Sequence, residues 1–426
     1  MAENLIIIAK TLFVIAMAFG FLLVVIWFER KGSAFIQDRV GPNRAAILGV
    51  RLAGFIQNFA DVTKLIMKEM FIPGEVNRIY FILAPFIGFT FILTSFAVIP
   101  FADNLRIGGF DIPMQVADLN VGVLYILAIT SLNVYGIVLA GWSSNNKFSL
   151  LGGLRSTAQM ISYEIPLGLS IVGIFMVFGS LHLNEIVRAQ GELLFGFLPR
   201  WGIFVQPLGF IIFISAAYAE ANRTPFDIPE GESEIVAGYH VEYSGMRFAL
   251  FYMGEYIALV LSSALVVTLF FGGWQIPYLD TSDLIRHASV VLKVLLLGGA
   301  AMSLAAAIAF IGYAKRLKGT WGDIHDREGH VLTTFAVLAL AVFLVVLFWL
   351  WNVEFPDWAA RTIALISQVG MFLIKVLFFG WLFIWVRWTL PRFRYDQLMG
   401  LGWKALIPLS FINILISGLV ILLVQR

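Results

Sequence analysis

The chain of 426 residues contains no cysteine, only five histidines, and few charged side chains, which make up 13% of the sequence. Without cysteine it forms no disulfide and supplies no thiolate to an iron–sulfur cluster or to c-type haem. The scarce histidines show neither metal-ligand spacing nor the pairing on facing membrane helices that b-type haem requires. A glycine-rich nucleotide motif and a nucleophile with an assignable base are also absent from the sequence. Any redox centre that acts with this chain must therefore belong to a partner.

Hydrophobic residues, in contrast, make up 60% of the chain, and its mean hydropathy is +0.88. Soluble domains are close to half apolar, so this composition exceeds what a soluble core needs. A spanning helix takes about 20 mainly apolar residues. We therefore predict an all-α, polytopic integral membrane protein with about ten transmembrane helices, near residues 5–28, 79–101, 121–141, 161–180, 203–221, 248–272, 288–312, 332–351, 362–386 and 404–424.

The distribution of basic residues predicts the orientation of these helices. Lys and Arg are concentrated in the odd-numbered loops, which by the positive-inside rule face the cytoplasm. Both termini are then expected on the outer side. The formal net charge is only +2 and the chain has no basic block, so nucleic acid is not an expected partner.

The long first loop contains an amphipathic segment at residues 51–69. Apolar residues such as Phe55 and Phe59 fall on one helical stripe, whereas Asp61 and Lys64 fall on the other. This pattern predicts one interfacial helix, which either anchors the loop to the membrane surface or covers a cavity there.

The most acidic stretch of the chain is residues 220–243, between the predicted fifth and sixth helices. One interpretation is a solvated acidic loop, since charge runs are usually solvated. The interleaved Pro225, Phe226 and Pro229 favour a second interpretation, a segment folded into the membrane interface. The carboxylates in this stretch are Glu220, Asp227, Glu230, Glu232, Glu234 and Glu242.

Several ionisable residues fall within the predicted spans and are candidates for function by default. Glu164 is expected near the start of the fourth helix, Glu220 at the end of the fifth, and Glu255 inside the sixth. Lys375, in the ninth helix, could equally cap a helix end or form a buried ion pair, or take part in a charge pathway.

Several motifs, in order along residues 1–272 and 362–426, closely resemble one family of membrane subunits of respiratory complex I, the proton-pumping NADH:quinone oxidoreductase. The mitochondrial counterpart in this family is subunit 1 of complex I. The motifs include Trp-Phe-Glu-Arg-Lys at 27–31, Gln-Asp-Arg-Val-Gly-Pro-Asn-Arg at 37–44, Ser-Tyr-Glu at 162–164, Asn-Arg-Thr-Pro-Phe-Asp-Ile-Pro-Glu-Gly-Glu-Ser-Glu at 222–234, Gly-Tyr-His-Val-Glu-Tyr-Ser-Gly at 238–245 and Pro-Arg-Phe-Arg-Tyr-Asp-Gln-Leu-Met at 391–399.

This resemblance implies a chamber for quinone whose entrance is framed by the first, the amphipathic and the sixth helix. It implies that the chamber is lined or supported by Arg30, Arg39, Asp61, Lys64, Arg223, Phe226 and Asp227. It also implies an acidic proton pathway from the chamber into the membrane, made of Glu164, Glu220, Glu230, Glu232, Glu234, Glu242 and Glu255. No catalytic residue and no metal ligand of this chain follow from it.

The resemblance further implies the setting of the chain in the plasma (inner) membrane. Quinone is the expected substrate, and FMN and iron–sulfur clusters are expected only in partner subunits. The expected partners are the hydrophilic quinone-site and iron–sulfur subunits, the adjacent small membrane subunits and the lipid bilayer.

The chain departs from the eight-helix family core in one region. Residues 273–361 read as an inserted peripheral transmembrane hairpin between a core of six helices at 1–272 and the last two core helices at 362–426. Phe148 also replaces a tyrosine that is common in its motif.

Two alternative functions remain open from the sequence. One is the homologous membrane anchor of an energy-converting hydrogenase or related ion-pumping oxidoreductase. The other is an autonomous secondary transporter, against which the lack of internal repeats argues.

Overall fold

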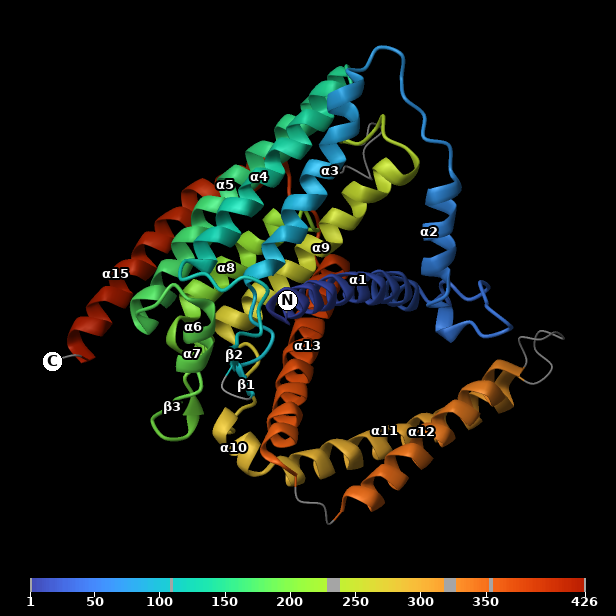
Figure 1. Cartoon of the computed structure of the whole chain (residues 1–426). Helices are drawn as coiled ribbons and strands as arrows, with labels where there is room; N and C mark the ends of the chain where they lie inside the picture. Colours follow the sequence, from blue (N-terminus) through green and yellow to red (C-terminus); the bar gives the residue numbers. More distant parts are fainter. Residues whose placement is uncertain (1, 108–109, 228–237, 318–326, 352–354, 425–426) are drawn as a thin grey trace.

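The computed structural model describes residues 2–107, 110–227, 238–317, 327–351 and 355–424 (Figure 1). Within these residues the chain is almost wholly helical, which confirms the predicted all-α class. The strands that the described part contains form two short antiparallel ribbons. They pair β1 (Leu105–Ile107) with β2 (Phe110–Ile112), and β3 (Leu193–Leu194) with β4 (Leu198–Pro199).

Nine helical runs in the described part are long and apolar enough to span a membrane. They are α1 (Ala2–Ile36), α3 (Arg78–Ser95), α4 (Gly122–Ser143), α5 (Lys147–Phe178), α9 (Gly245–Phe270), α11 (Ala288–Leu317), α12 (Glu328–Leu350), α13 (Asp357–Thr389) and the continuous run of α14 (Tyr395–Gly400), η4 (Leu401–Leu406) and α15 (Ile407–Val424). The shorter helices are η1 (Leu52–Gly54), α2 (Gln57–Met67), η2 (Phe96–Val98), α6 (Leu183–Ala189), α7 (Gly202–Val205), α8 (Pro207–Glu220) and α10 (Thr281–Arg286).

The predicted span at 203–221 is broken rather than continuous. Gln206 has a non-helical backbone, and Pro207 begins α8, which has only 14 residues. At 1.5 Å per residue, α8 is about 21 Å long, shorter than the roughly 30 Å hydrocarbon core. A hydropathy window does not detect this break because Gln206 and Pro207 are flanked by apolar residues on both sides.

Two spans are longer than their apolar runs. The first helix continues to Ile36 and therefore contains Glu29 and Arg30. The fourth predicted span, α5, begins at Lys147, where the Asn146 side chain accepts a 2.9 Å hydrogen bond from the Phe148 backbone nitrogen. The expectation that Glu164 lies near the start of this helix is therefore wrong, since Glu164 lies near its middle. Polar residues in both extensions are accommodated because they are buried in protein rather than in lipid.

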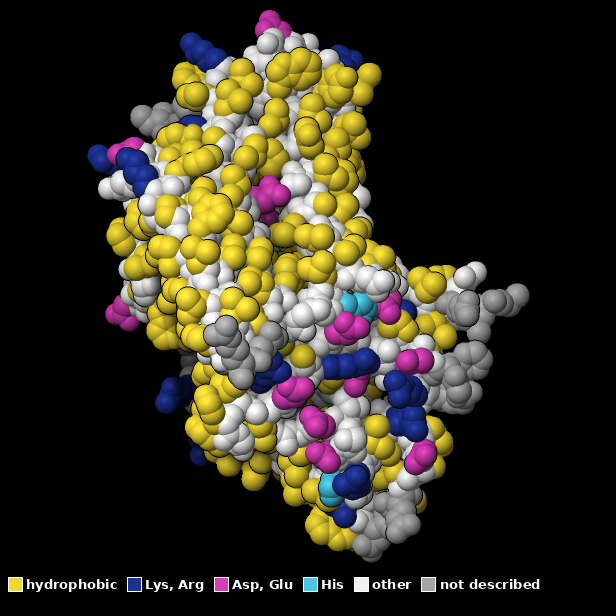
Figure 2. Space-filling view, turned by 90° about the vertical axis from the view of Figure 1, so that its left-hand side faces the viewer, with side chains coloured by type: hydrophobic (Ala, Val, Ile, Leu, Met, Phe, Trp, Pro, Cys, Tyr) yellow, Lys and Arg dark blue, Asp and Glu magenta, His cyan; other side chains and the backbone are white. Residues whose placement is uncertain are grey.

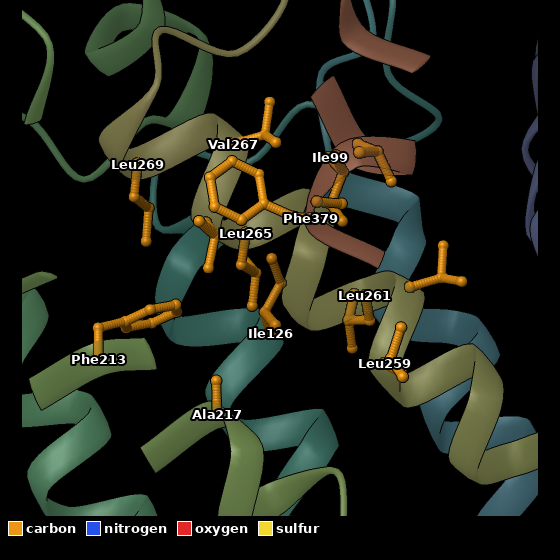
Figure 3. Close-up of a cluster of buried hydrophobic side chains, with 14 of the residues drawn as sticks. Ile99, Ile126, Phe213, Ala217, Leu259, Leu261, Leu265, Val267, Leu269 and Phe379 are labelled. Atoms are coloured by element: carbon orange, nitrogen blue, oxygen red, sulfur yellow. The ribbon is translucent and has the colours of Figure 1, made fainter. Parts of the chain in front are cut away.

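Helix α9 is the centre of the fold. In its most apolar window, 89% of the residues are buried, and its side chains pack against those of α4, α8 and α13 (Figure 3). Leu265 and Val267 of α9, for example, lie in one cluster with Ile126, Phe213 and Phe379. The neighbouring α3 and α4 approach closely, because a Cβ atom on Gly136 would lie 2.8 Å from the backbone nitrogen of Gly88. Such small-residue contacts are typical of helices that pack in membranes.

The helices α11 and α12 form a hairpin at the side of this body (Figure 1). They pack mainly against each other, and α11 also contacts α13. Only 6% of the most apolar window of α12 is buried, so almost all of this helix faces the surroundings. Such a surface suits contact with lipid tails.

The amphipathic segment forms η1 and α2 rather than one helix over 51–69. Gly54, with φ +87°, separates them, and a Cβ atom there would clash with the Pro42 carbonyl oxygen. Helix α2 contacts both α1 and α9.

Candidate functional site

A narrow cavity of about 80 Å³ lies between α1, α2 and α9. Its wall is mostly apolar, with a few polar groups, and consists of Leu22, Leu23, Ile26, Arg30, Asn58, Asp61, Val62, Leu65, Met246, Ala249, Tyr252 and Met253. Among these, Arg30 of α1 donates a hydrogen bond to Asp61 of α2. An apolar slot with a few placed polar groups is the usual form of a site for an amphiphilic ligand.

Hydrogen bonds hold α2 in place beside this cavity. The buried Asn58 side chain donates a 2.9 Å hydrogen bond from Nδ2 to the Leu23 carbonyl oxygen of α1. On the same helix, Gln57 Nε2 donates a 3.0 Å bond to Asp61 Oδ1 and so orients the carboxylate towards Arg30. The polar stripe of α2 is thus used partly for binding α1, not only for contact with water.

Behind the cavity, the buried carboxylate of Glu29 collects three donors from different parts of the chain. Tyr256 of α9 donates a 2.7 Å hydrogen bond to Oε2, and Arg223 donates one of 3.3 Å to the same oxygen. Arg387 of α13 donates to Oε1. The basic groups compensate the buried negative charge, as a buried carboxylate requires.

Tyr252 connects the cavity with this buried carboxylate. Its ring lines the cavity, and its hydroxyl lies 2.9 Å from that of Tyr256 one helical turn away. The guanidinium of Arg223 stacks 3.9 Å from the centre of the Tyr256 ring. A continuous series of hydrogen bonds therefore runs from the cavity through Tyr252 and Tyr256 to Glu29, and it can transmit either a proton or a change of charge.

The beginning of the acidic stretch is held close to this network. The Phe226 ring packs against Tyr163 and Phe393, each with a centroid distance of 5.4 Å. Arg392 forms a 3.1 Å ion pair with Asp227. The buried Gln159 side chain of α5 donates a 2.7 Å bond to the Phe226 carbonyl oxygen. The described start of the stretch is thus folded against the helices, in agreement with the second interpretation of its sequence for these residues.

Two of the predicted membrane carboxylates lie on one small internal cavity. Glu220 and Glu255 both line it, together with Asn133 and Tyr239. Tyr239 donates a 3.4 Å hydrogen bond to Glu255 Oε1. Glu164 of α5 acts electrostatically on Glu220. Figure 2 shows acidic side chains recessed in an otherwise hydrophobic face of the molecule.

The remaining predicted site residues lie elsewhere. Lys64 is exposed on α2 and does not line the cavity. Arg39 is exposed in the loop after α1 and donates a 2.7 Å bond to Gln37. Glu242 accepts a 2.7 Å bond from Asn146 and lines a separate surface hollow. The predicted pathway residues Glu230, Glu232 and Glu234 lie outside the described residues.

Lys375 is placed so that it decides between its two sequence interpretations. Its ammonium donates to the carbonyl oxygens of Phe271, Gly273 and Gln275, at 2.8, 3.0 and 2.7 Å. These carbonyls follow the carboxyl end of α9, which attracts a positive charge. The contacts favour the capping alternative over a pathway role.

Sequence reasoning missed several members of the buried network. Tyr252, Tyr256, Arg387 and Arg392 were not among the candidates, and Glu29 stood out only as an unusual acid beside basic residues. The two arginines are indistinguishable in sequence from the basic residues that flank any cytoplasmic helix end. A tyrosine directly after Glu255 was the one available signal for α9.

The comparisons with known proteins point in one direction. The family described as NADH dehydrogenase matches residues 9–323 and 329–418. The NADH-quinone oxidoreductase H subunit 1 of Cytophaga hutchinsonii is 40% identical over 395 residues, which cover 93% of this chain and 90% of that protein. The chain belongs to the NADH dehydrogenase family.

Other members of the NADH dehydrogenase family match over similar lengths. The NADH-quinone oxidoreductase H subunit of Bdellovibrio bacteriovorus is 38% identical over 93% of this chain and 91% of its own length. NADH-quinone oxidoreductase subunit 8 of Rhodothermus marinus is 42% identical, with the same two coverages. The predicted membership in this family of membrane subunits of NADH-quinone oxidoreductase is thus confirmed. The ranges matched by the NADH dehydrogenase family also extend through most of residues 273–361.

Proposed function

We propose that this chain forms the membrane wall of the quinone chamber of an NADH-quinone oxidoreductase and couples quinone reduction to proton translocation. The observation that carries the proposal is the apolar cavity between α1, α2 and α9, which is connected by Tyr252 and Tyr256 to the buried Glu29. Ligand pockets usually measure about 300–1,000 Å³. A cavity of about 80 Å³ therefore fits a lateral entrance, and a hydrophilic partner subunit supplies the opposite wall of the chamber.

The chemistry of the substrate explains why such a site needs this network. Reduction of a quinone to a quinol consumes two electrons, which an iron–sulfur cluster of a partner subunit supplies, and two protons. The apolar walls of the cavity accept the isoprenoid tail, and the Arg30–Asp61 pair meets the polar ring. A change of charge in the chamber acts on Glu29 and Arg223 through low-dielectric surroundings, where it is only weakly screened.

The acidic residues then carry the effect into the membrane. Arg223 and Asp227 flank the start of the acidic stretch, so a change at Glu29 biases the carboxylates that follow, Glu230, Glu232, Glu234 and Glu242. A charge within about 4–6 Å shifts a carboxyl pKa by roughly one to three units. Glu255, Glu220 and Glu164 continue the pathway towards the middle of the membrane.

The proposal includes the surroundings of the chain. It lies in the plasma (inner) membrane with both termini on the outer side, since the basic residues are concentrated in the odd-numbered loops. Hydrophilic subunits that carry FMN and iron–sulfur clusters bind its cytoplasmic side, and small membrane subunits bind beside it. Residues 273–361 act as a peripheral hairpin between the two parts of the core.

The quinone entrance is tested by filling the cavity. Val62→Trp places a large ring in the wall made by α2, whereas Val294→Trp, on the exposed face of α11, is the matched control. In the assembled complex, a photoreactive azido-quinone should label α1, α2 or α9, and Val62→Trp should abolish this labelling. Labelling confined to other subunits would contradict the entrance.

The coupling role is tested separately. Glu220→Gln and Glu164→Gln should lower the number of protons translocated per quinone reduced by reconstituted complex in vesicles. Glu192→Gln, which changes an exposed carboxylate paired with Arg200, serves as the control. An unchanged proton ratio in both pathway variants would contradict the relay.

A further inference from the structure

The free end of the α11–α12 hairpin is bound to the loop that precedes α2. Glu328, the first residue of α12, forms a buried ion pair with Arg51, with Nε and Oε2 2.6 Å apart. The two residues are 277 positions apart, and each is only 1% exposed. Tyr313 of α11 completes the contact by donating a 3.2 Å hydrogen bond to Glu328 Oε2. We call Arg51, Tyr313 and Glu328 the Arg51–Glu328 cluster.

The cluster binds the backbone of the loop as well as its side chain. Glu328 Oε1 accepts hydrogen bonds from the backbone nitrogens of Arg51 and Leu52, at 2.8 and 2.9 Å. These nitrogens open a tight turn in which Leu52 and Ala53 have φ of 47° and 52°. Non-glycine residues rarely adopt this conformation, which costs on the order of 1–3 kcal/mol for each residue unless surrounding contacts hold it. Successive backbone N–H groups in such a turn form a concave site for an anion, and the Glu328 carboxylate occupies it.

The turn leads directly into the wall of the cavity. The Ala53 carbonyl oxygen accepts a 3.1 Å bond from Trp27 Nε1 of α1, and Phe55 packs edge-on against the Trp27 ring. Three residues after Gly54, α2 begins and places Asn58 and Asp61 on the cavity. The position of α2 therefore depends at its amino end on the turn that Glu328 organises.

The apex of the hairpin is itself closely packed. A Cβ atom on Gly329 would clash with the backbone of Ala314, so α12 starts in direct backbone contact with α11 beside Tyr313. Arg51 Nη2 also donates a 3.1 Å bond to the Tyr313 hydroxyl. Both helices of the hairpin thus hold the carboxylate at one place.

We infer that the hairpin braces the quinone entrance, with Arg51, Tyr313 and Glu328 as positioning residues that hold α2 against α1 through the turn at 51–54. The inference rests on the proposed function for its effect on quinone, but its effect on α2 is independent of that proposal. It assigns the hairpin a role that its lipid-facing surface alone does not explain.

The brace is tested in the assembled complex by hydrogen–deuterium exchange of peptides that cover residues 57–67. In Glu328→Ala, local opening of α2 becomes easier, and its amides should exchange about tenfold faster than in the unaltered protein. Glu328→Gln keeps an oxygen acceptor for the two backbone nitrogens but not the charge, so an intermediate rate is expected. Glu192→Ala, which removes an exposed paired carboxylate, should leave the exchange of α2 unchanged.

The same variants separate positioning from a general loss of structure. Glu328→Ala should raise the KM for a long-tailed quinone about fivefold while kcat stays within about twofold, because the entrance and not the reacting end is altered. If Glu328→Ala does not assemble, Tyr313→Phe, which removes one hydroxyl, should show the same changes to a smaller extent.

Unchanged exchange of residues 57–67 in both variants would overturn the brace. Faster exchange with an unchanged KM would support the brace of α2 and contradict the quinone entrance of the proposed function.

Discussion

Tyr256 donates a 2.7 Å hydrogen bond to Glu29 Oε2, although the two residues are 227 positions apart in the chain. This bond connects the central helix α9 with α1, and Tyr252 extends it to the wall of the cavity. A buried hydrogen bond to a charged group stabilises a structure more than a neutral one. It also gives the cavity an electrostatic connection to the acidic residues beyond it.

We expect Tyr256→Phe to reduce quinone turnover. The change keeps the ring on which Arg223 stacks but removes the hydroxyl, and a hydrogen bond to a charged group contributes about 1.5–3 kcal/mol. The expected result is a fall of about tenfold in kcat/KM for quinone reduction. Tyr135→Phe, on the exposed face of α4, is the matched control. Equal activity of the two variants would show that the network has no part in turnover.

Glu29→Gln should destabilise the protein. It removes the negative charge that Arg223 and Arg387 share, and loss of one partner of a buried pair costs about 3–5 kcal/mol. The measurement is the Tm of the purified complex, with Glu192→Gln in an exposed pair as the control. Combining Glu29→Gln with Arg387→Gln should recover part of the loss, since both members of a pair are then neutral. Strictly additive losses would contradict direct coupling between them.

Lys375→Met should lower stability without changing coupling. The variant loses three hydrogen bonds from a charged donor to carbonyls beyond the end of α9, and a loss of about 2 kcal/mol or more is expected. Lys10→Met, which loses one such bond, should have a smaller effect. The protons translocated per quinone should stay unchanged in vesicles. A lower proton ratio would assign Lys375 to the pathway after all.

The pH dependence of stability should include a contribution from Tyr243, which lies just before α9. Burial raises the pKa of the Tyr243 hydroxyl from 10.0 to about 12. Below pH 10 the hydroxyl is protonated in both the folded and the unfolded state, so its contribution is fully present. Between pH 10 and 12 the unfolded state releases the proton first, so stability falls by up to about 3 kcal/mol as pH rises.

This contribution is measured as the difference between two proteins. Tyr243→Phe keeps the stacking on Phe81, whose ring centroid is 4.1 Å away, but cannot titrate. The Tm of the unaltered protein should therefore fall more steeply above pH 10 than that of the variant. Parallel curves would mean that Tyr243 titrates normally in the folded state.

The spans could be predicted from sequence to different degrees for a physical reason. A helix in lipid must be apolar along its length, so α3 and α9 are recognisable from local composition alone. The first half of α5 is not, because Ser149, Ser156 and Gln159 are buried among other helices and not in lipid. The break at Gln206 is likewise set by packing, since its amide donates a 2.7 Å bond to Ser417 Oγ of α15.

The candidate site divides in the same way. Glu164, Glu220 and Glu255 stand out in sequence because a carboxylate in an apolar run is rare and costly. Glu29 and Arg387 carry no comparable signal, since each lies among charged residues near a predicted helix end. Only the folded chain brings these two residues together across 358 positions.

Composition and local order alone determined that this protein is a helical membrane protein, which motifs relate it to its family, and which acids lie in its spans. Burial in lipid acts on each segment separately, so its requirements are written in each segment. The tertiary structure decided which charges meet, how α2 is held beside the cavity, and that Lys375 caps α9. These outcomes depend on pairing between distant side chains, and the free energy of such a pair exists only when both members are in place.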